Sequence, residues 1–261
     1  QACPAGSACS TGATEPTECA AGSFSNSNGA SACTQCSAGS FQGNKGQQSC
    51  ESCTAGGYCP EGAVAPTLCA GGSYSAGQGN AAQSHCDACP EGSACAAGAT
   101  EATVCAAGTV APQMGAAACD LCAAGTFQGS TGQTSCETCT AGGYCARRSV
   151  AATLCEAGRY SAEEGNDESG DCSTCPTGAY CAMGSTEPTA CSAGTVQPQT
   201  EQASCDKCEA GKYQDEGGQL TCLSCPGGYY CAEGATSGLP CPSGRYQDNE
   251  LTVMTSSDDC L

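Results

Sequence analysis

Thirty of the 261 residues are cysteine, and many of them stand in Cys-x-x-Cys pairs, so thiol chemistry is the first question that the sequence raises. In a reducing compartment this spacing indicates a redox site or a zinc site. A thioredoxin-like site needs a single motif on a strand–helix turn, and only one histidine, His85, is present to join a zinc site. Here the pairs recur along the whole chain, which is typical of a disulfide scaffold. We therefore predict no cofactor and no metal site.

The other reactive side chains do not form a catalytic set. His85 lies beside Cys86, and the residue 86 positions further on is Asp171, so His85 is predicted to be a surface residue rather than a catalytic base. One acidic segment has oxygen ligands that calcium would accept, but it lacks the spacing of an ordered calcium loop, which favours a solvated loop. Its carboxylates are those of Glu163, Glu164, Asp167, Glu168 and Asp171. We predict that the chain is not an enzyme.

A short pattern, Cys-x-x-Gly-x-aromatic, positions the cysteines. It occurs at fifteen places, for example at Cys36, Gly39 and Phe41; the third residue after each cysteine is always Gly, and the fifth is aromatic in eleven copies. A Gly at a constant position indicates a tight turn with positive φ. Each copy is therefore predicted to be a turn that presents one ring, which packs against a neighbouring disulfide and supplies most of the packing. Short two-stranded ribbons are predicted where the chain returns to the next cysteine, as in 41–47 and 127–133.

The copies are grouped into a longer repeat of 86 residues, because ten cysteines recur at that interval with only the last displaced by two residues. The predicted repeats are 1–87, 88–173 and 174–261. The first is divided into modules 3–33, 36–50 and 53–86, the second into 89–119, 122–136 and 139–172, and the third into 175–205, 208–222 and 225–260.

Disulfide pairing does not follow from sequence alone, but one tiling uses every cysteine. It gives each four-cysteine module first-to-third and second-to-fourth bridges, and each two-cysteine module a single bridge. The predicted pairs are Cys3–Cys19, Cys9–Cys33, Cys36–Cys50, Cys53–Cys69 and Cys59–Cys86, then Cys89–Cys105, Cys95–Cys119, Cys122–Cys136, Cys139–Cys155 and Cys145–Cys172, then Cys175–Cys191, Cys181–Cys205, Cys208–Cys222, Cys225–Cys241 and Cys231–Cys260.

Composition excludes an ordinary hydrophobic core. Leu, Ile, Val and Phe together number 17, and the net charge is −19, values that without cysteines would indicate disorder. Each bridge that closes a loop of about 15 residues contributes roughly 3 kcal/mol, so disulfides replace the core. The predicted fold class is a row of small disulfide-rich modules: an elongated rod of short β-ribbons and ordered loops, without a large hydrophobic core and with little or no helix.

The segments 33–41 and 222–230, which read Cys-x-x-Cys-x-x-Gly-x-aromatic, resemble the ephrin-receptor-like cysteine-rich repeats. That family is extracellular and is similar to the cysteine-rich domains of tumour-necrosis-factor receptors. The segment 180–186 resembles repeats in large surface proteins of algae and ciliates. The resemblance extends over essentially the whole chain, and it implies an architecture without a shared activity.

The disulfides predict an oxidising compartment, so the protein is expected to be secreted or on the cell surface. No run of 18 apolar residues occurs, which predicts no membrane span in this chain. The charge balance of 26 acidic against seven scattered basic residues argues against nucleic acid as a partner. O-glycans on exposed Ser and Thr near Pro remain an open expectation. The pair Arg147-Arg148 is either a processing site or, more simply, two surface residues.

The regularity favours an extracellular structural protein that forms a surface coat or, by self-association, a head-to-tail fibre. The alternative is a binding module, the ectodomain or stalk of a cell-surface receptor or surface antigen. For assembly, the sequence points to the longer loop of the third repeat, whose apolar residues are Leu251, Val253 and Met254. These would meet a site at the other end of an identical chain, where Ala8 replaces a ring. The same loop is also compatible with a simple cap on the last module.

Overall fold

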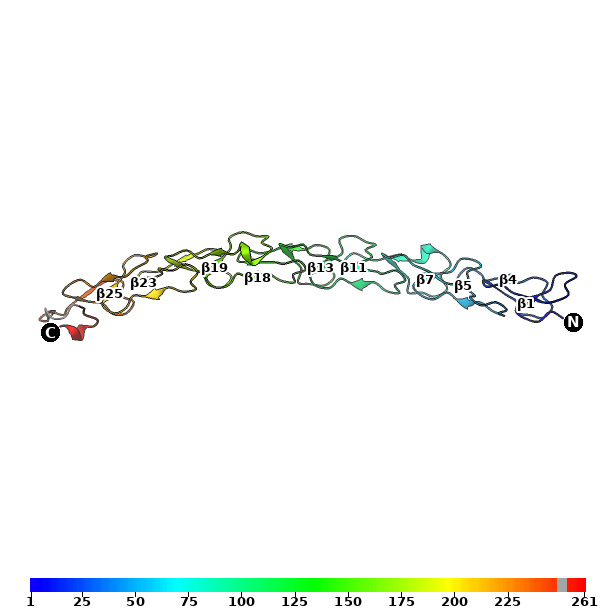
Figure 1. Cartoon of the computed structure of the whole chain (residues 1–261), viewed down its shortest axis with the longest axis horizontal. Helices are drawn as coiled ribbons and strands as arrows, with labels where there is room; N and C mark the ends of the chain where they lie inside the picture. Colours follow the sequence, from blue (N-terminus) through cyan, green and yellow to red (C-terminus); the bar gives the residue numbers. More distant parts are fainter. Residues whose placement is uncertain (248–252) are drawn as a thin grey trace. The chain divides into compact units, whose positions relative to one another are not determined.

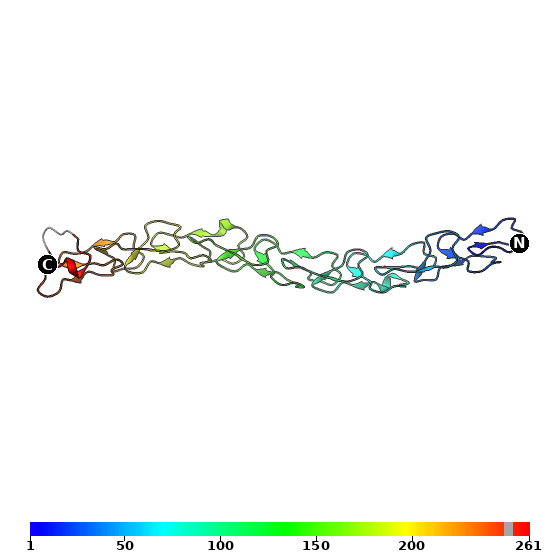
Figure 2. The same ribbon diagram turned by 90° about the horizontal axis from the view of Figure 1, so that it is seen from below.

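The structure, a computed structural model, describes residues 1–247 and 253–261. It contains two compact units, of which the first comprises Gln1–Cys122 with Gln128–Cys136 and the second Ala123–Phe127 with Glu137–Leu261. Within each unit the ribbons follow one another in sequence order, as two perpendicular views show (Figures 1 and 2). The predicted division into three repeats and its module boundaries stay a prediction.

Each ribbon consists of two antiparallel strands of two residues. In addition, four strand residues form single parallel bridges to a residue of a later loop, namely Tyr74 with Ala99, Phe127 with Ser149, Tyr160 with Ser185 and Tyr213 with Ala235. In the first unit the ribbons are β1 (Ser7–Ala8) with β2 (Thr17–Glu18), β3 (Ser23–Phe24) with β4 (Thr34–Gln35), β5 (Ser40–Phe41) with β6 (Glu51–Ser52), β7 (Gly57–Tyr58) with β8 (Thr67–Leu68), β9 (Ser73–Tyr74) with β10 (Asp87–Ala88), β11 (Ser93–Ala94) with β12 (Thr103–Val104) and β13 (Thr109–Val110) with β14 (Asp120–Leu121).

In the second unit the ribbons are β15 (Thr126–Phe127) with β16 (Glu137–Thr138), β17 (Gly143–Tyr144) with β18 (Thr153–Leu154), β19 (Arg159–Tyr160) with β20 (Ser173–Thr174), β21 (Ala179–Tyr180) with β22 (Thr189–Ala190), β23 (Thr195–Val196) with β24 (Asp206–Lys207), β25 (Lys212–Tyr213) with β26 (Leu223–Ser224) and β27 (Tyr229–Tyr230) with β28 (Leu239–Pro240). The described residues include no α-helix and three single 3-10 turns, η1 (Gln83–His85), η2 (Ser169–Asp171) and η3 (Ser257–Asp259). The predicted short ribbons and loops without helix are confirmed. The placement of two ribbons within 41–47 and 127–133 is wrong, because β5 and β15 pair with strands that follow Cys50 and Cys136.

The glycine turn begins each ribbon. In the copy that starts at Cys36, the amide of Ser40 donates to the carbonyl of Ser37 at 3.0 Å, and Gly39 has φ +91°. Only Gly adopts this backbone without strain at the third position of such a turn. The next two residues form β5, and the chain returns as β6 directly before the following cysteine, with Phe41 opposite Glu51.

A second property of glycine matters at the same position, namely the absence of a side chain. Gly22 has φ +83°, and a Cβ built on it would collide with the carbonyl oxygen of Gly62, about forty residues further along the chain. The amide of Gly22 donates to the carbonyl of Gln42 at 2.7 Å. Close backbone approach, as well as turn geometry, therefore requires Gly here.

The buried interior is built mainly from cysteines. Nearly all of the most deeply buried side chains are half-cystines, and the rings of the repeated pattern are half-buried except Tyr246, which is exposed. Phe41 packs against the disulfide of Cys53 and Cys59, and Tyr160 packs in the same way against Cys175 and Cys181. The predicted ring–disulfide contact is confirmed for these two copies, but the expectation that the rings supply most of the packing is wrong, because the half-cystines lie deeper.

All thirty cysteines form disulfides, and the pairing differs from the predicted tiling. The structure has Cys3–Cys9, Cys19–Cys33, Cys36–Cys50, Cys53–Cys59 and Cys69–Cys86, then Cys89–Cys95, Cys105–Cys119, Cys122–Cys136, Cys139–Cys145 and Cys155–Cys172, then Cys175–Cys181, Cys191–Cys205, Cys208–Cys222, Cys225–Cys231 and Cys241–Cys260. The bridges of the two-cysteine modules are as predicted, and the crossed pairs of the four-cysteine modules are wrong.

The glycine turn explains the correction. In the copy that starts at Cys53, the turn at Gly56 reverses the chain and brings the Cα atoms of Cys53 and Cys59 to 5.8 Å, which is the usual span of a disulfide. Cys69 is then free to bond with Cys86 and close the following loop, and this loop contains η1. Each four-cysteine set thus forms two successive bridges rather than two interlocked ones.

Peptide mapping without reduction tests this pairing. We expect one peptide pair that joins Cys53 to Cys59 and another that joins Cys69 to Cys86, with equivalents 86 residues later, because the turns place these cysteines within bonding distance. A peptide that joins Cys53 to Cys69 would contradict the structure and restore the crossed tiling.

Two alanine substitutions in one copy separate the roles of glycine. Gly29 has φ +81°, but a Cβ at this position would have no atom within 4 Å. Gly29→Ala should therefore lower the free energy of unfolding only by the cost of a left-handed backbone, about 1–2 kcal/mol. Gly22→Ala should lower the free energy of unfolding by the same cost and by about 1 kcal/mol more, because the new Cβ would displace the hydrogen bond from Gly22 N to Gln42 O. Guanidinium denaturation with the disulfides intact measures both variants. Equal losses would show that close approach does not matter at Gly22.

Candidate functional site

The contact between one copy and the next is the most regular feature of the molecule, and we call it the copy junction. At the junction after Gly39, its amide donates to Cys59 O at 2.8 Å, Gln42 N donates to Ala63 O at 3.1 Å, and Gly62 N donates back to Cys36 O at 2.8 Å. Equivalent bonds recur at most other copies within each unit. Because all donors and acceptors are main-chain groups, the junction constrains surface side chains little.

Buried glutamines hold the loops between the ribbons. Gln42 donates from Nε2 to Ser49 O at 2.8 Å and accepts at Oε1 from the amide of Asn44 at 3.0 Å. The same pair of bonds is made by Gln128, Gln197 and Gln214. These glutamines were not predicted from the sequence, although the recurrence of Gln directly after the fifth position of the pattern would have indicated them.

Two buried asparagines hold the longer loops in the same manner. Asn80 Nδ2 contacts Gly57 O at 3.1 Å, Ser75 Oγ at 2.7 Å and Gly77 O at 2.8 Å, and Asn166 makes the equivalent contacts 86 residues later. No buried polar side-chain atom within the described part of the chain lacks a partner. These amides therefore compensate for a small apolar interior by keeping the loops ordered.

Acidic residues cap two of the three 3-10 turns. Asp171 Oδ2 accepts from the amides of Asp167 at 2.9 Å and Glu168 at 3.2 Å. Asp259 Oδ2 likewise accepts from the amide of Thr255 at 2.7 Å and that of Ser256 at 3.0 Å. These backbone hydrogen bonds favour the ionised form, so they lower the pKa of both carboxyls below the ordinary value of 3.8.

His85 occupies the position of Asp171 in the first repeat. It is exposed, as predicted, and its Nδ1 lies 3.2 Å from Ala82 O. The carboxylate of Asp171, expected to be a ligand or a solvated group, instead serves as a cap. The described residues contain no group of three or more side chains that could hold a metal ion.

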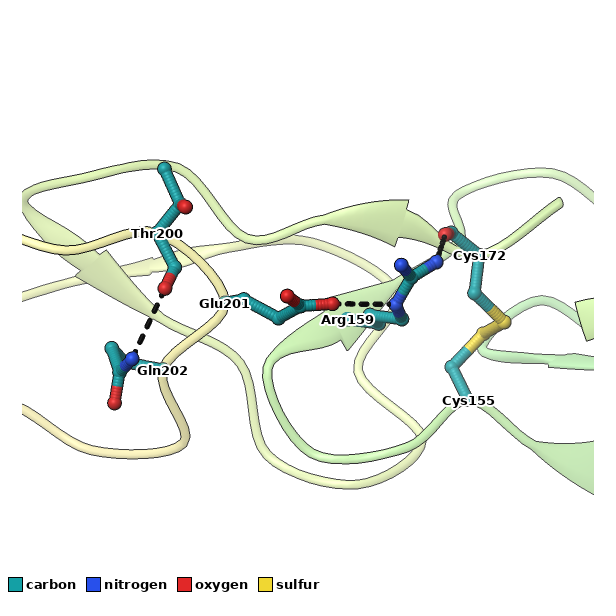
Figure 3. A network of polar contacts seen from close by, with 6 residues as sticks. All are labelled: Cys155, Arg159, Cys172, Thr200, Glu201 and Gln202. Atoms are coloured by element: carbon teal, nitrogen blue, oxygen red, sulfur yellow. Dashed lines mark hydrogen bonds and ion pairs between the residues drawn. A yellow bond between two sulfur atoms is a disulfide. The ribbon is translucent and has the colours of Figure 1, made fainter. Parts of the chain in front are cut away.

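An ion pair joins two copies of the second unit, those that start at Cys155 and Cys191, which have one copy between them in the sequence (Figure 3). Arg159 Nε lies 2.9 Å from Glu201 Oε1, and Arg159 Nη1 donates to Cys172 O at 2.9 Å. Glu201 has φ +64° and stands 86 residues after Gly115, so it occupies a glycine position. The side chains are 37% and 51% exposed, so the pair offsets only part of the cost of left-handed backbone.

A cavity of about 380 Å³ lies beside this pair, lined by Tyr144, Glu156, Arg159, Ser169, Gly170, Cys172 and Glu201. Its cation, Arg159, is already neutralised by Glu201, and Glu156 adds a second negative charge. The cavity therefore does not present a free positive group to an anion, and its lining contains no nucleophile–base pair.

The residues proposed for assembly differ in their exposure to solvent. Met254 is buried at 1% exposure and its carbonyl accepts from Cys231 N at 3.1 Å, whereas Val253 is exposed and Leu251 lies outside the described residues. Placing Met254 on an exposed assembly surface is therefore wrong, because its side chain is buried with its Sδ 3.9 Å from Sγ of Cys241, which belongs to the Cys241–Cys260 disulfide. This burial supports the cap interpretation that the sequence left open.

Two segments, residues 22–66 and 194–237, match the family model described as "Tyrosine-protein kinase ephrin type A/B receptor-like". They begin at equivalent positions of the first and third repeats, because 194 − 22 = 172 is twice the repeat of 86 residues. No curated protein matches the chain. Among the described residues, no helix has the length and apolar character that a membrane crossing requires.

With fifteen disulfides in a repeated pattern, the chain is a cysteine-rich repeat protein that carries ephrin-receptor-like segments. Its fold is of the disulfide-rich, extracellular type, because bridges at this density persist in an oxidising compartment.

Acid titration tests the caps. A carboxyl whose pKa is lowered by folding stabilises the fold fully above 3.8, and this contribution is lost as the pH falls through the lowered folded-state value. We expect the backbone amide signals of Asp167 and Thr255 in NMR spectra to shift with midpoints below 3.8. Asp171→Asn should abolish the transition at Asp167 only, with Thr255 as internal control. A midpoint above 3.8 would contradict the caps.

Proposed function

We propose that this chain is a structural spacer of an extracellular protein, which serves in a surface coat or fibre and has no catalytic activity. The copy junction is the observation that carries the proposal. Its main-chain hydrogen bonds repeat from copy to copy within each unit, as at Gly39 with Cys59 and Gly125 with Cys145. In repeat proteins of this kind, stability is a sum of local and nearest-neighbour terms, so copies can be added without disturbing those already present.

The surface composition supports the same role. The net charge of −19 keeps such chains soluble and apart from one another along their sides. Contacts between chains are then expected at restricted places, which is the condition for ordered coats and for open head-to-tail assembly. Exposed Val253 remains available for such a contact, although buried Met254 does not.

The second candidate is the stalk or binding ectodomain of a cell-surface receptor. The receptor-like description of the family model that matches 22–66 and 194–237 favours it. A stalk also uses the spacer property, whereas a ligand-binding ectodomain needs a singular surface. The two candidates therefore differ in whether length or one particular face matters.

Removal of one complete repeat tests the spacer role. No disulfide joins residues 88–173 to the rest of the chain, so their deletion leaves every remaining cysteine with its partner. We expect the particle length in rotary-shadowed electron micrographs to fall by about a third, and duplication of the same residues to raise it by about a third. An unchanged length in both variants would exclude a spacer.

A further inference from the structure

One loop of the second repeat differs in charge from its equivalents. Arg147 and Arg148 stand where the first repeat has Glu61 and Gly62, at the same interval of 86 residues. The third repeat has Glu233 and Gly234 there. The chain contains only seven basic residues, and this is the one place where two of them are adjacent. The substitution therefore reverses the charge of a loop whose backbone is otherwise repeated.

Arg148 adopts the backbone conformation of the glycines that it replaces. Its φ is +69°, compared with +73° for Gly62 and +72° for Gly234. This left-handed region is disfavoured for residues with a Cβ. The loop at Arg148 is consequently strained in a way that its two equivalents are not, and opening it into an extended strand relieves that strain.

Both arginine side chains are exposed, and within the described residues neither guanidinium takes part in a hydrogen bond or ion pair. By contrast, Glu233 in the equivalent loop pairs with Lys207 at 3.4 Å. The next residue is held within its turn by the bond from Ser149 N to Ala146 O at 3.1 Å. The pair is thus accessible to a partner that recognises two adjacent cations.

The disulfide pairing gives the bond after Arg148 a particular property. It lies between Cys145, which is bonded to Cys139, and Cys155, which is bonded to Cys172, so no bridge spans it. The crossed pairing predicted from the sequence would have spanned it twice. Four of the other basic residues lie inside loops closed by a disulfide, namely Lys45, Arg159, Lys212 and Arg245.

Lys207 is the remaining basic residue, and its following bond is also outside a closed loop. However, Lys207 is a single basic residue, it belongs to β24, and its side chain is paired with Glu233. Arg147 and Arg148 are therefore the only pair of basic residues in the sequence, and one cut after them would separate the chain into two parts without a covalent connection.

We propose that the Arg148–Ser149 peptide bond is a processing site for an extracellular or secretory endoprotease that recognises paired basic residues. Carboxylates in the specificity pockets of such an enzyme bind guanidinium groups through charge-assisted, bidentate hydrogen bonds. Water adds across the bond: the carbonyl carbon of Arg148 gains the oxygen and becomes a carboxylate, and the nitrogen of Ser149 leaves as an amine. The products are residues 1–148 and 149–261.

After the cut, only non-covalent contacts would join the two products. These include the bonds from Gly142 N to Ser161 O and from Gly165 N to Cys139 O, each 2.8 Å long. Main-chain hydrogen bonds of this kind are individually weak in net terms and are lost when the parts separate. Processing at this bond thus provides a route by which the array is divided at one defined place.

The test uses the intact chain with its disulfides formed and a purified subtilisin-like protease that requires two consecutive basic residues. We expect one cut, which gives the fragments 1–148 and 149–261 on a denaturing gel run without reductant. Arg147→Glu with Arg148→Gly, the residues of the first and third repeats, should lose the cut while retaining the near-ultraviolet spectrum of the parent.

A matched control places the same pair inside a closed loop. Asn44→Arg with Lys45→Arg creates paired arginines between Cys36 and Cys50, where a cut should release a separate fragment only after reduction. The proposal is overturned if the folded parent stays intact under conditions that cleave the reduced, alkylated chain after Arg148. It is equally overturned if the Glu-Gly variant still yields the same two fragments.

Discussion

Glycine turns approach the backbone of later copies so closely that both the backbone conformation and the size of the side chain are restricted at these positions. Gly22 faces the carbonyl of Gly62, and Gly125 faces that of Gly165, so closely that no Cβ would fit. The contact needs positive φ at the turn and an absent side chain at once, and glycine alone meets both conditions. Once this contact is formed, the junction bonds follow, because the amide of the turn already points at its acceptor.

The disulfides complete what the glycine contact begins. Each bridge closes one turn, as in Cys53–Cys59, or one loop, as in Cys69–Cys86, and none connects distant copies. A chain with few large apolar residues thereby gains a buried interior of half-cystines, against which rings such as Phe41 pack. Buried amides such as Gln42 then order the loops that this small interior cannot hold. The fold is therefore stabilised by many local disulfide-closed turns and loops, and one large core is not needed.

Two positions depart from the repeat because a residue with a long side chain replaces glycine. Glu201 and Arg148 both occupy glycine positions and keep the glycine backbone, with φ of +64° and +69°. Glu201 gains an ion pair with Arg159 that ties two copies together. The side chain of Arg148 gains no such contact within the described residues, so local structure does not explain its presence. The left-handed backbone of Arg148 is thus strained without a compensating local contact, which favours a functional role for this loop.

Features that depend on neighbours along the chain could be predicted from the order of the residues. The fifteen copies, the turn at each Gly such as Gly39, the short ribbons without helix and the contact of Phe41 with a disulfide all follow from the spacing and the chemistry of adjacent residues. Such features could be predicted because a turn or a ribbon of this size is specified within a few residues.

Features that depend on distance in space are set by the folded chain. Cys53 pairs with Cys59 because the folded turn brings their Cα atoms to 5.8 Å, and spacing alone allowed Cys69 equally well. Asp171 is a cap and Met254 is buried because of contacts that the spacing of residues in the sequence does not predict. Repetition restricts a pairing rule to one that works in every copy, but several rules satisfy it. The choice among them is made by the path of the backbone, which is set when one glycine turn meets the next copy.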